Sequence, residues 1–337
     1  MKKIVIHDPT LRDGNHAVAH QLSAKQIDIY TKAAEKAGIP VVEVGHGNGL
    51  GASSLQVGEA LVSDVIMLEA ARKNLRNSKL SIHCIPGFAT IKRDLERAIS
   101  IGVDVVRVAS HCTEADITQR HIAFCREKGK DTYGVLMMSH MASVKMLVEE
   151  AQKMELYGAE GIIIMDSSGT YLPADVTERI NALVNGLGVP VGFHGHNNLG
   201  MAIANSITAV EAGAKILDAT ARGFGAGAGN TQLEALIAVM ERMGYETGIN
   251  LYKMLDAADI AEKELMPKVP TISSESIVSG LSGVFSGFAK HVSRISKEYN
   301  VDPRDVYFEL GKRKVIAGQE DLIIEVVMEL VKNNEDK

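Results

Sequence analysis

Short runs of β-branched and other apolar residues alternate eight times with stretches of helical periodicity along the first two thirds of the chain. Both faces of these runs are largely apolar, which is typical of parallel strands buried on two sides. The expected strands cover residues 4–7, 41–44, 80–85, 103–108, 132–138, 161–165, 189–193 and 215–219. Eight such units in about 245 residues predict a closed (β/α)₈ TIM barrel.

An open, doubly wound sheet is the alternative fold. It would be favoured by a glycine-rich turn after the first strand, but residues 8–14 contain no G-x-G-x-x-G pattern. After about residue 250 the pattern changes to helices alone, expected at 251–265, 276–292, 302–310 and 319–331. We therefore expect a TIM-barrel catalytic domain over residues 1–258 and a helical domain over residues 259–337.

Composition excludes several classes of function. Lys and Arg number 36 against 42 Asp and Glu, a net charge of −6 that argues against a nucleic-acid or anionic-membrane surface. The chain has 3 Cys and no C-x-x-C pair, so no disulfide framework is expected and a reducing, cytoplasmic location fits. No apolar run approaches the length of a membrane span.

Polar residues follow nearly every expected strand. In TIM barrels the chemistry lies at the carboxyl ends of the strands, so these residues are the candidate site. For the histidines 46, 83, 111 and 140, a role in capping strands fits as well as a functional one. The set comprises Asp8, Arg12, Asp13, His16, Glu43, His46, His83, Arg107, Ser110, His111, Ser139, His140, Asp166, Ser167, His194, His196, Asp218 and Arg222.

The pair His194 and His196 indicates a metal site. Residues two apart on a strand point to the same side, and two imidazoles there supply half of a coordination shell. An H-x-H pair alone is more often structural, but Asp13 ends the first strand, which only one strand separates from the seventh in a closed barrel. Two His and one Asp suit Mn²⁺, Mg²⁺ or Co²⁺ better than a closed structural Zn²⁺ site.

Two neighbours of Asp13 complete the candidate chemistry. Arg12 offers a fixed fork of donors to an oxyanion or carboxylate. A purely structural role in an ion pair with Glu43 is the alternative, and both roles can hold together. His16 can act as a base near neutral pH. The glycine-rich segment 223–230 is either a flexible loop or a nest of backbone N–H groups that approaches an anion.

The sequence resembles the DRE-TIM metallolyase superfamily in DPTLRDG at 8–14, in Glu43 and in HGHN at 194–197. Within it, the chain is similar to the 4-hydroxy-2-oxovalerate aldolase family. The strings that carry this likeness are LRDGNHA at 11–17, VGHGNGL at 44–50, ASHCTEAD at 109–116, LMMSHM at 136–141, GAGAGN at 225–230 and GQED at 318–321.

The resemblance implies a role for each candidate residue. Asp13, His194 and His196 would hold a divalent metal, with Mn²⁺ first and Mg²⁺ or Co²⁺ as alternatives. Arg12 would stabilise an enolate, His16 would be the base, and Ser167 would contact substrate along with Arg12, Asp13 and His194. The family places a substrate-contacting Tyr where this chain has Phe285, and a further His where it has Asn197.

The implied activity is that of a lyase of aromatic hydrocarbon catabolism. It would cleave 4-hydroxy-2-oxopentanoate, or a close 4-hydroxy-2-oxo acid, to pyruvate and an aldehyde. The resemblance also implies an oligomer and pairing with an acylating acetaldehyde dehydrogenase. The alternatives are a thioester lyase or Claisen-type acyl-CoA synthase of the same superfamily, and a non-catalytic metal-binding scaffold. The thioester lyases of this superfamily carry a Cys in the loop that corresponds to residues 223–230, and this chain has no Cys there.

Overall fold

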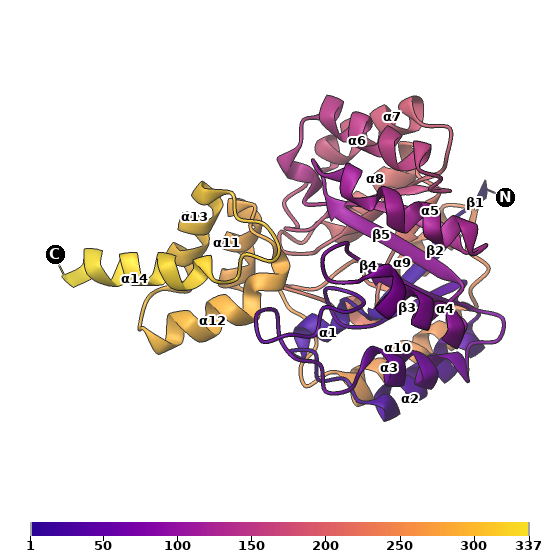
Figure 1. The fold of residues 1–337 in the computed structure, drawn as a ribbon, viewed down its shortest axis with the longest axis horizontal. Coiled ribbons are helices and arrows are strands. Elements are labelled where there is room, and N and C mark those ends of the chain that lie inside the picture. Colours follow the sequence, from indigo (N-terminus) through magenta and orange to yellow (C-terminus); the bar gives the residue numbers. More distant parts are fainter. Residues whose placement is uncertain (1, 336–337) are drawn as a thin grey trace.

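Eight parallel strands form a closed barrel in the computed structural model, which describes residues 2–335, with side chains up to residue 332 (Figure 1). The last strand pairs with the first, so the predicted TIM barrel is confirmed and the open sheet is excluded. The barrel strands are β2 (Val5–Leu11), β3 (Val41–Val44), β4 (Lys79–Cys84), β5 (Val105–His111), β6 (Asp131–Met137), β7 (Ile162–Asp166), β8 (Val191–Gly195) and β9 (Ile216–Asp218).

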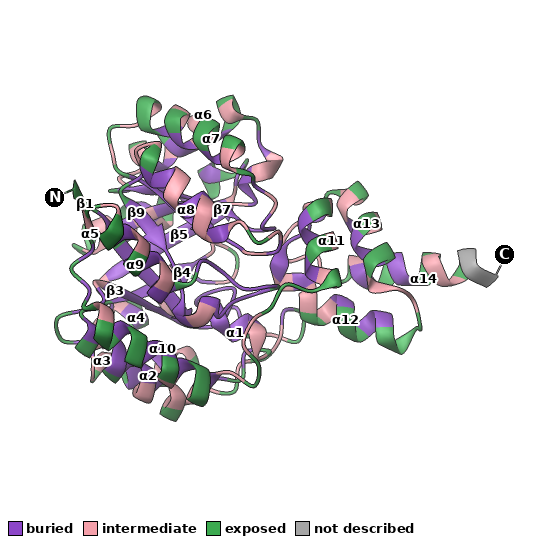
Figure 2. Cartoon of the chain, turned by 180° about the vertical axis from the view of Figure 1, so that it is seen from behind, coloured by how far each residue is buried: buried purple, intermediate pink, exposed green. Residues whose placement is uncertain are grey.

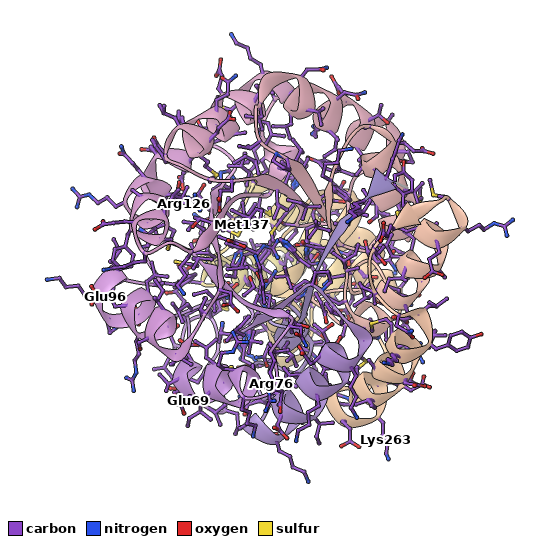
Figure 3. All side chains as sticks on the ribbon, turned by 90° about the vertical axis from the view of Figure 1, so that its right-hand side faces the viewer. Glu69, Arg76, Glu96, Arg126, Met137 and Lys263 are labelled. Atoms are coloured by element: carbon purple, nitrogen blue, oxygen red, sulfur yellow. The ribbon has the colours of Figure 1, made fainter. Side chains whose placement is uncertain are left out.

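Helices surround the barrel, and their buried faces make one core with the strands (Figure 2). Viewed along the barrel, Met137 lies near the centre, whereas Glu69, Glu96 and Lys263 lie on the outer ring (Figure 3). The longer helices are α2 (Ala24–Ala37), α3 (Asp64–Arg72), α4 (Glu96–Ile101), α5 (Gln119–Glu127), α6 (Val144–Leu156), α7 (Pro173–Gly186), α8 (Ala202–Glu211) and α9 (Leu233–Arg242). The short ones are α1 (Gly14–Ala17), η1 (Ile91–Leu95), η2 (Ala115–Thr118), η3 (Ser139–Met141) and η4 (Ala221–Gly223).

Local signals set where the helices begin and end. Helix α2 shows this: the Ser23 hydroxyl accepts from the Gln26 backbone N–H, and the Gln26 side chain accepts from the Ser23 backbone. This reciprocal capping box satisfies two N–H groups that would otherwise lack a partner. At the other end Gly38 adopts the left-handed conformation that closes the last turn.

Helix α10 (Leu251–Leu265) packs on the barrel beside α2, where the Gln26 amide donates to the Glu264 carbonyl (2.7 Å). The chain then forms a lobe at the other end of the molecule (Figure 1). This lobe has its own apolar core, which includes Phe288, Val292 and Tyr307. Its helices are α11 (Ser274–Ser282), η5 (Ser286–Phe288), α12 (Ala289–Glu298), α13 (Pro303–Arg313) and α14 (Leu322–Glu335).

The single helix expected over 276–292 is wrong, because the chain breaks at Gly283. That residue has a φ of 68°, a left-handed conformation that ends α11, and the His140 ring donates to its carbonyl oxygen (3.0 Å). The Ser286 backbone N–H then donates to the Ser167 carbonyl oxygen at the barrel mouth (3.0 Å). The break therefore brings Phe285, between these two anchors, onto the barrel.

A second small sheet pairs β1 (Lys2–Lys3) with β10 (Tyr245–Glu246). The sequence pattern did not indicate it, because two-residue strands are too short to show periodicity. Among residues 2–335, no helix is both long and apolar enough to cross a membrane.

Candidate active site

Asp13, His194 and His196 converge at the carboxyl end of the barrel. Each offers a ligand atom, and these atoms lie within 4.8 Å of one another. The two Nε2 atoms of the histidines are 3.3 Å apart, and all three side chains are buried. One carboxylate oxygen and two imidazole nitrogens form a donor set that suits a divalent cation.

The protonation states of these residues also suit a cation. Burial alone would raise the pKa of Asp13, but the Arg12 guanidinium and the two imidazoles hold it well below its usual range. Burial lowers the pKa of His196 to about 4. At neutral pH the carboxyl group is therefore ionised and this imidazole neutral, as ligation requires.

Asp218 orients His194. The pairing of β8 with β9 places the two residues side by side, and His194 Nδ1–H donates to Asp218 Oδ2 (2.9 Å). This hydrogen bond fixes the tautomer that leaves the Nε2 lone pair free. The sequence marked Asp218 only as a strand-end residue, since the pairing register is not visible in it.

Alternating charges connect Asp218 to Asp13 through the barrel interior. Arg107 contacts Asp218 and donates to Glu43 (3.1 Å). Arg12 donates to the same Glu43 through Nε (2.7 Å) and to Asp13 through Nη1 (2.6 Å). The expected ion pair of Arg12 with Glu43 is therefore present. Arg12 Nη2 has no protein partner among the described residues, so one arm of the guanidinium remains available to a ligand.

The glycine-rich segment 223–230 wraps around Asp13. The Asn230 side-chain amide and the Ala226 backbone N–H both donate to Asp13 Oδ2, at 2.6 and 3.3 Å. A Cβ on Gly225 would lie 2.5 Å from the same oxygen, so only glycine permits this approach. The anion that this loop meets is thus the Asp13 carboxylate itself.

A small cavity at this end of the barrel is lined by two of the three candidate ligands, Asp13 and His196. His16 lies on it, and burial lowers the pKa of this imidazole to about 3. The Phe285 ring lies edge-on to His16, with 6.2 Å between ring centroids. Six of the seven predicted site residues line this cavity, and His194 adjoins His196. The lining comprises Arg12, Asp13, His16, Gly47, Asn48, His83, Ile85, Met137, Met165, Ser167, His196 and Phe285.

Several other candidates lie outside this cavity and have structural partners. The His46 ring bonds to the Gly58 carbonyl oxygen (3.0 Å), and His111 bonds to Thr113 (2.8 Å). His140 holds Gly283, as described above. The Asn197 side-chain oxygen accepts from the Ala202 N–H (3.2 Å) at the start of α8. The Asn at position 197 thus serves the fold.

The HMGL-like family model matches residues 3–261, and the DmpG-like communication domain matches residues 270–332. A 4-hydroxy-2-oxovalerate aldolase of Pectobacterium atrosepticum is 66% identical over 99% of this chain and 98% of its own length. The chain belongs to the 4-hydroxy-2-oxovalerate aldolase family. A family member from Spirochaeta aurantia is also 66% identical, over 97% of this chain and 96% of its own.

Solved structures support the aldolase fold. The N-terminal domain of a putative aldolase from Bacteroides vulgatus superposes with a TM-score of 0.74 at 24% identity, covering 88% of this chain and 98% of its own. The carboxyl transferase domain of Rhizobium etli pyruvate carboxylase with oxamate and biotin has a TM-score of 0.83 at 17% identity, covering 98% of this chain and 61% of that one. At these identities the likeness concerns the fold alone.

Proposed function

We propose that this aldolase cleaves 4-hydroxy-2-oxopentanoate, or a close 4-hydroxy-2-oxo acid, to pyruvate and an aldehyde in a metal-dependent reaction. The convergence of Asp13, His194 and His196 beside a buried cavity that also holds Arg12 and His16 carries this proposal. The three converging residues would hold the cation, Mn²⁺ first and Mg²⁺ or Co²⁺ as alternatives. Bound there, the cation would act as a Lewis acid that polarises the 2-oxo group.

The protein side chains account for the rest of the reaction. His16 is neutral at pH 7 and takes the proton from the C4 hydroxyl. The C3–C4 bond then breaks, the aldehyde leaves, and the electron pair passes into the pyruvate enolate, which takes up a proton at C3 to give pyruvate. The free Nη2 of Arg12 donates to the enolate oxygen, while Glu43 and Asp13 hold the guanidinium in place. Ser167 directly follows strand β7, and its Oγ accepts a hydrogen bond from the Met138 N–H. From this place it positions the substrate.

Substrate class separates this proposal from its alternatives. We expect pyruvate to form from 4-hydroxy-2-oxopentanoate without coenzyme A, measured by coupling to lactate dehydrogenase and NADH. A thioester lyase or acyl-CoA synthase would instead require a coenzyme A substrate, and a scaffold would turn over neither. Activity confined to thioesters would refute the proposal.

Replacing Asp218 with asparagine is expected to weaken metal binding by about 10–100-fold. The neutral amide oxygen accepts the His194 Nδ1–H more weakly than a carboxylate does, and the change leaves Arg107 with one buried charge partner fewer. Titration of the stripped protein with Mn²⁺ by calorimetry measures the change. Unchanged affinity would show that His194 does not depend on this hydrogen bond.

Replacing Phe285 with tyrosine is expected to alter the handling of the aldehyde. A new hydroxyl in the cavity adds one hydrogen bond to the C4 end of the substrate, an effect of about tenfold or less. The measurement is the ratio of kcat/KM for the two C4 enantiomers, and for short against long aldehydes in condensation. Ratios equal to those of the wild type would mean that Phe285 does not contact the substrate.

We also propose that the helical region, residues 259–337, completes the pocket and binds an acylating acetaldehyde dehydrogenase. The seating of Phe285 on the cavity supports the first role, and the match to a communication domain supports the second. We expect the two purified proteins to co-elute from a sizing column. A fully active aldolase with no affinity for the dehydrogenase would count against this pairing.

A further inference from the structure

His83 is a buried histidine of the cavity whose ring has no hydrogen-bond partner in the described part of the chain. It lies on β4, its side chain is almost fully buried, and it lines the same cavity as Arg12, His16 and Phe285. No group among the described residues bonds to either ring nitrogen, and Nδ1 is fully shielded from solvent. Its main chain pairs with β5 opposite Arg107, and its backbone oxygen accepts from Leu50 N–H (2.9 Å).

An imidazole in this state is costly for the fold unless something else completes its hydrogen bonding. A buried polar group without a partner destabilises a protein. Three other histidines at the strand ends, His46, His140 and His194, do have protein partners. The partner of His83 is therefore expected to come from whatever fills the cavity.

The surroundings of His83 keep it neutral. Burial lowers its pKa to about 3, the nearby charges of Arg12 and Arg107 act in the same direction, and Glu43 opposes them. A neutral imidazole carries one N–H donor and one acceptor, so it suits an oxygen that changes between hydroxyl and carbonyl. The C4 oxygen of the substrate undergoes that change when the aldehyde forms.

Elimination among the cavity residues leads to the same oxygen. Three of its side chains, those of Arg12, His83 and His196, have a buried nitrogen without a hydrogen-bond partner among the described residues. In the proposed reaction, Arg12 and His196 act on the 2-oxo acid part of the substrate. At the aldehyde end His16 removes a proton, and the ring of Phe285 has no group that can donate.

We propose that His83 is a substrate-binding residue that donates a hydrogen bond to the C4 oxygen, on the aldehyde side of the substrate. This inference rests on the proposed aldolase function. In this role His83 supplies a hydrogen-bond donor at the end of the cavity where Phe285 has none. His83 thereby becomes a determinant of which aldehyde the enzyme releases or accepts.

The test compares a donor-free variant with one that keeps a donor. His83→Leu is expected to lower kcat/KM for cleavage about tenfold, the size of one neutral hydrogen bond, and His83→Asn to recover most of the loss. Exchange of the pyruvate methyl protons in D₂O requires the enolate but no aldehyde. The exchange rate of His83→Leu should therefore stay within about twofold of the wild-type rate. If His83→Leu does not fold, His83→Met, which adapts its shape more readily, replaces it.

A matched control lies on the same strand. Ser81 is also buried with an unpartnered side-chain oxygen, but it does not line the cavity. Ser81→Ala should leave both reactions unchanged. Wild-type cleavage by His83→Leu would overturn the proposal, as would equal losses of cleavage and exchange, which would place His83 on the pyruvate half.

The Phe285→Tyr background supplies a second arm. If the phenol reaches the same oxygen, His83→Leu should cost about twofold there instead of tenfold. Where Phe285→Tyr alone changes the C4 enantiomer ratio, so that the phenol does reach that end, equal losses in the two backgrounds would put His83 on another atom and overturn the assignment. Failure of the wild type to release pyruvate from any 4-hydroxy-2-oxo acid would instead refute the proposed function, and with it this inference.

Discussion

Replacing His16 with alanine is expected to lower kcat by about 10²–10⁴-fold, the usual effect of removing a general base. Metal affinity should stay near that of the wild type, because His16 lies on the cavity but outside the cluster of candidate ligands. Steady-state pyruvate release and calorimetric titration with Mn²⁺ measure the two quantities. His20→Ala is the matched control, since His20 packs against His16, with 5.1 Å between ring centroids, but does not line the cavity.

The pH dependence tests the same assignment. Burial lowers the pKa of His16 from an ordinary value near 6.5 to about 3, so the neutral, proton-accepting form persists as the pH falls. We therefore expect kcat to stay nearly constant between pH 7.5 and pH 6 at saturating metal. An ordinary imidazole would be mostly protonated at pH 6. A fall in kcat that follows a pKa of 6.5, or wild-type turnover by His16→Ala, would contradict the assignment.

Arg12→Lys is expected to lower kcat/KM by about 10²–10³-fold, as the loss of a preorganised oxyanion donor does. The guanidinium contacts Glu43, Asp13 and the cavity at once with separate nitrogens. A lysine keeps the charge, but its single nitrogen cannot reproduce this fork. Kinetics with 4-hydroxy-2-oxopentanoate, together with the melting temperature, separate lost catalysis from lost stability.

Arg222 provides the matched control for Arg12→Lys. It lies after β9 and pairs with Glu234, Asp259 and Glu262 outside the small cavity. Arg222→Lys should therefore leave kcat/KM nearly unchanged. A loss of less than tenfold in Arg12→Lys would mean that charge alone accounts for what Arg12 does.

The candidate metal cluster could be predicted because its signals are local. His194 and His196 share one face of a strand by their spacing, and the order of strands in a closed barrel puts Asp13 nearby. The roles of Arg12 as an oxyanion donor and of His16 as the base were predicted from residue type and position, whereas Ser167 as a substrate contact came from the family resemblance; all three roles remain predictions.

Other parts of the site depend on strand register and long-range contacts, which the sequence does not display. Asp218 lies beside His194 because of how β8 and β9 pair, and Arg107 reaches it from across the barrel. Likewise, apolar periodicity runs through 276–292 although Gly283 breaks the helix. Gly283 ends the helix in a left-handed conformation, and the ring of His140, far away in the sequence, then contacts its carbonyl oxygen.

Metal-dependent release of pyruvate tests the account most directly. The protein is stripped with a chelator, assayed with 4-hydroxy-2-oxopentanoate, and assayed again after addition of Mn²⁺, Mg²⁺ or Co²⁺. We predict that the stripped enzyme forms no pyruvate above background, that Mn²⁺ restores turnover, and that an anomalous map places the ion between Asp13, His194 and His196. Full turnover after exhaustive chelation, or an ion bound elsewhere, would contradict the account.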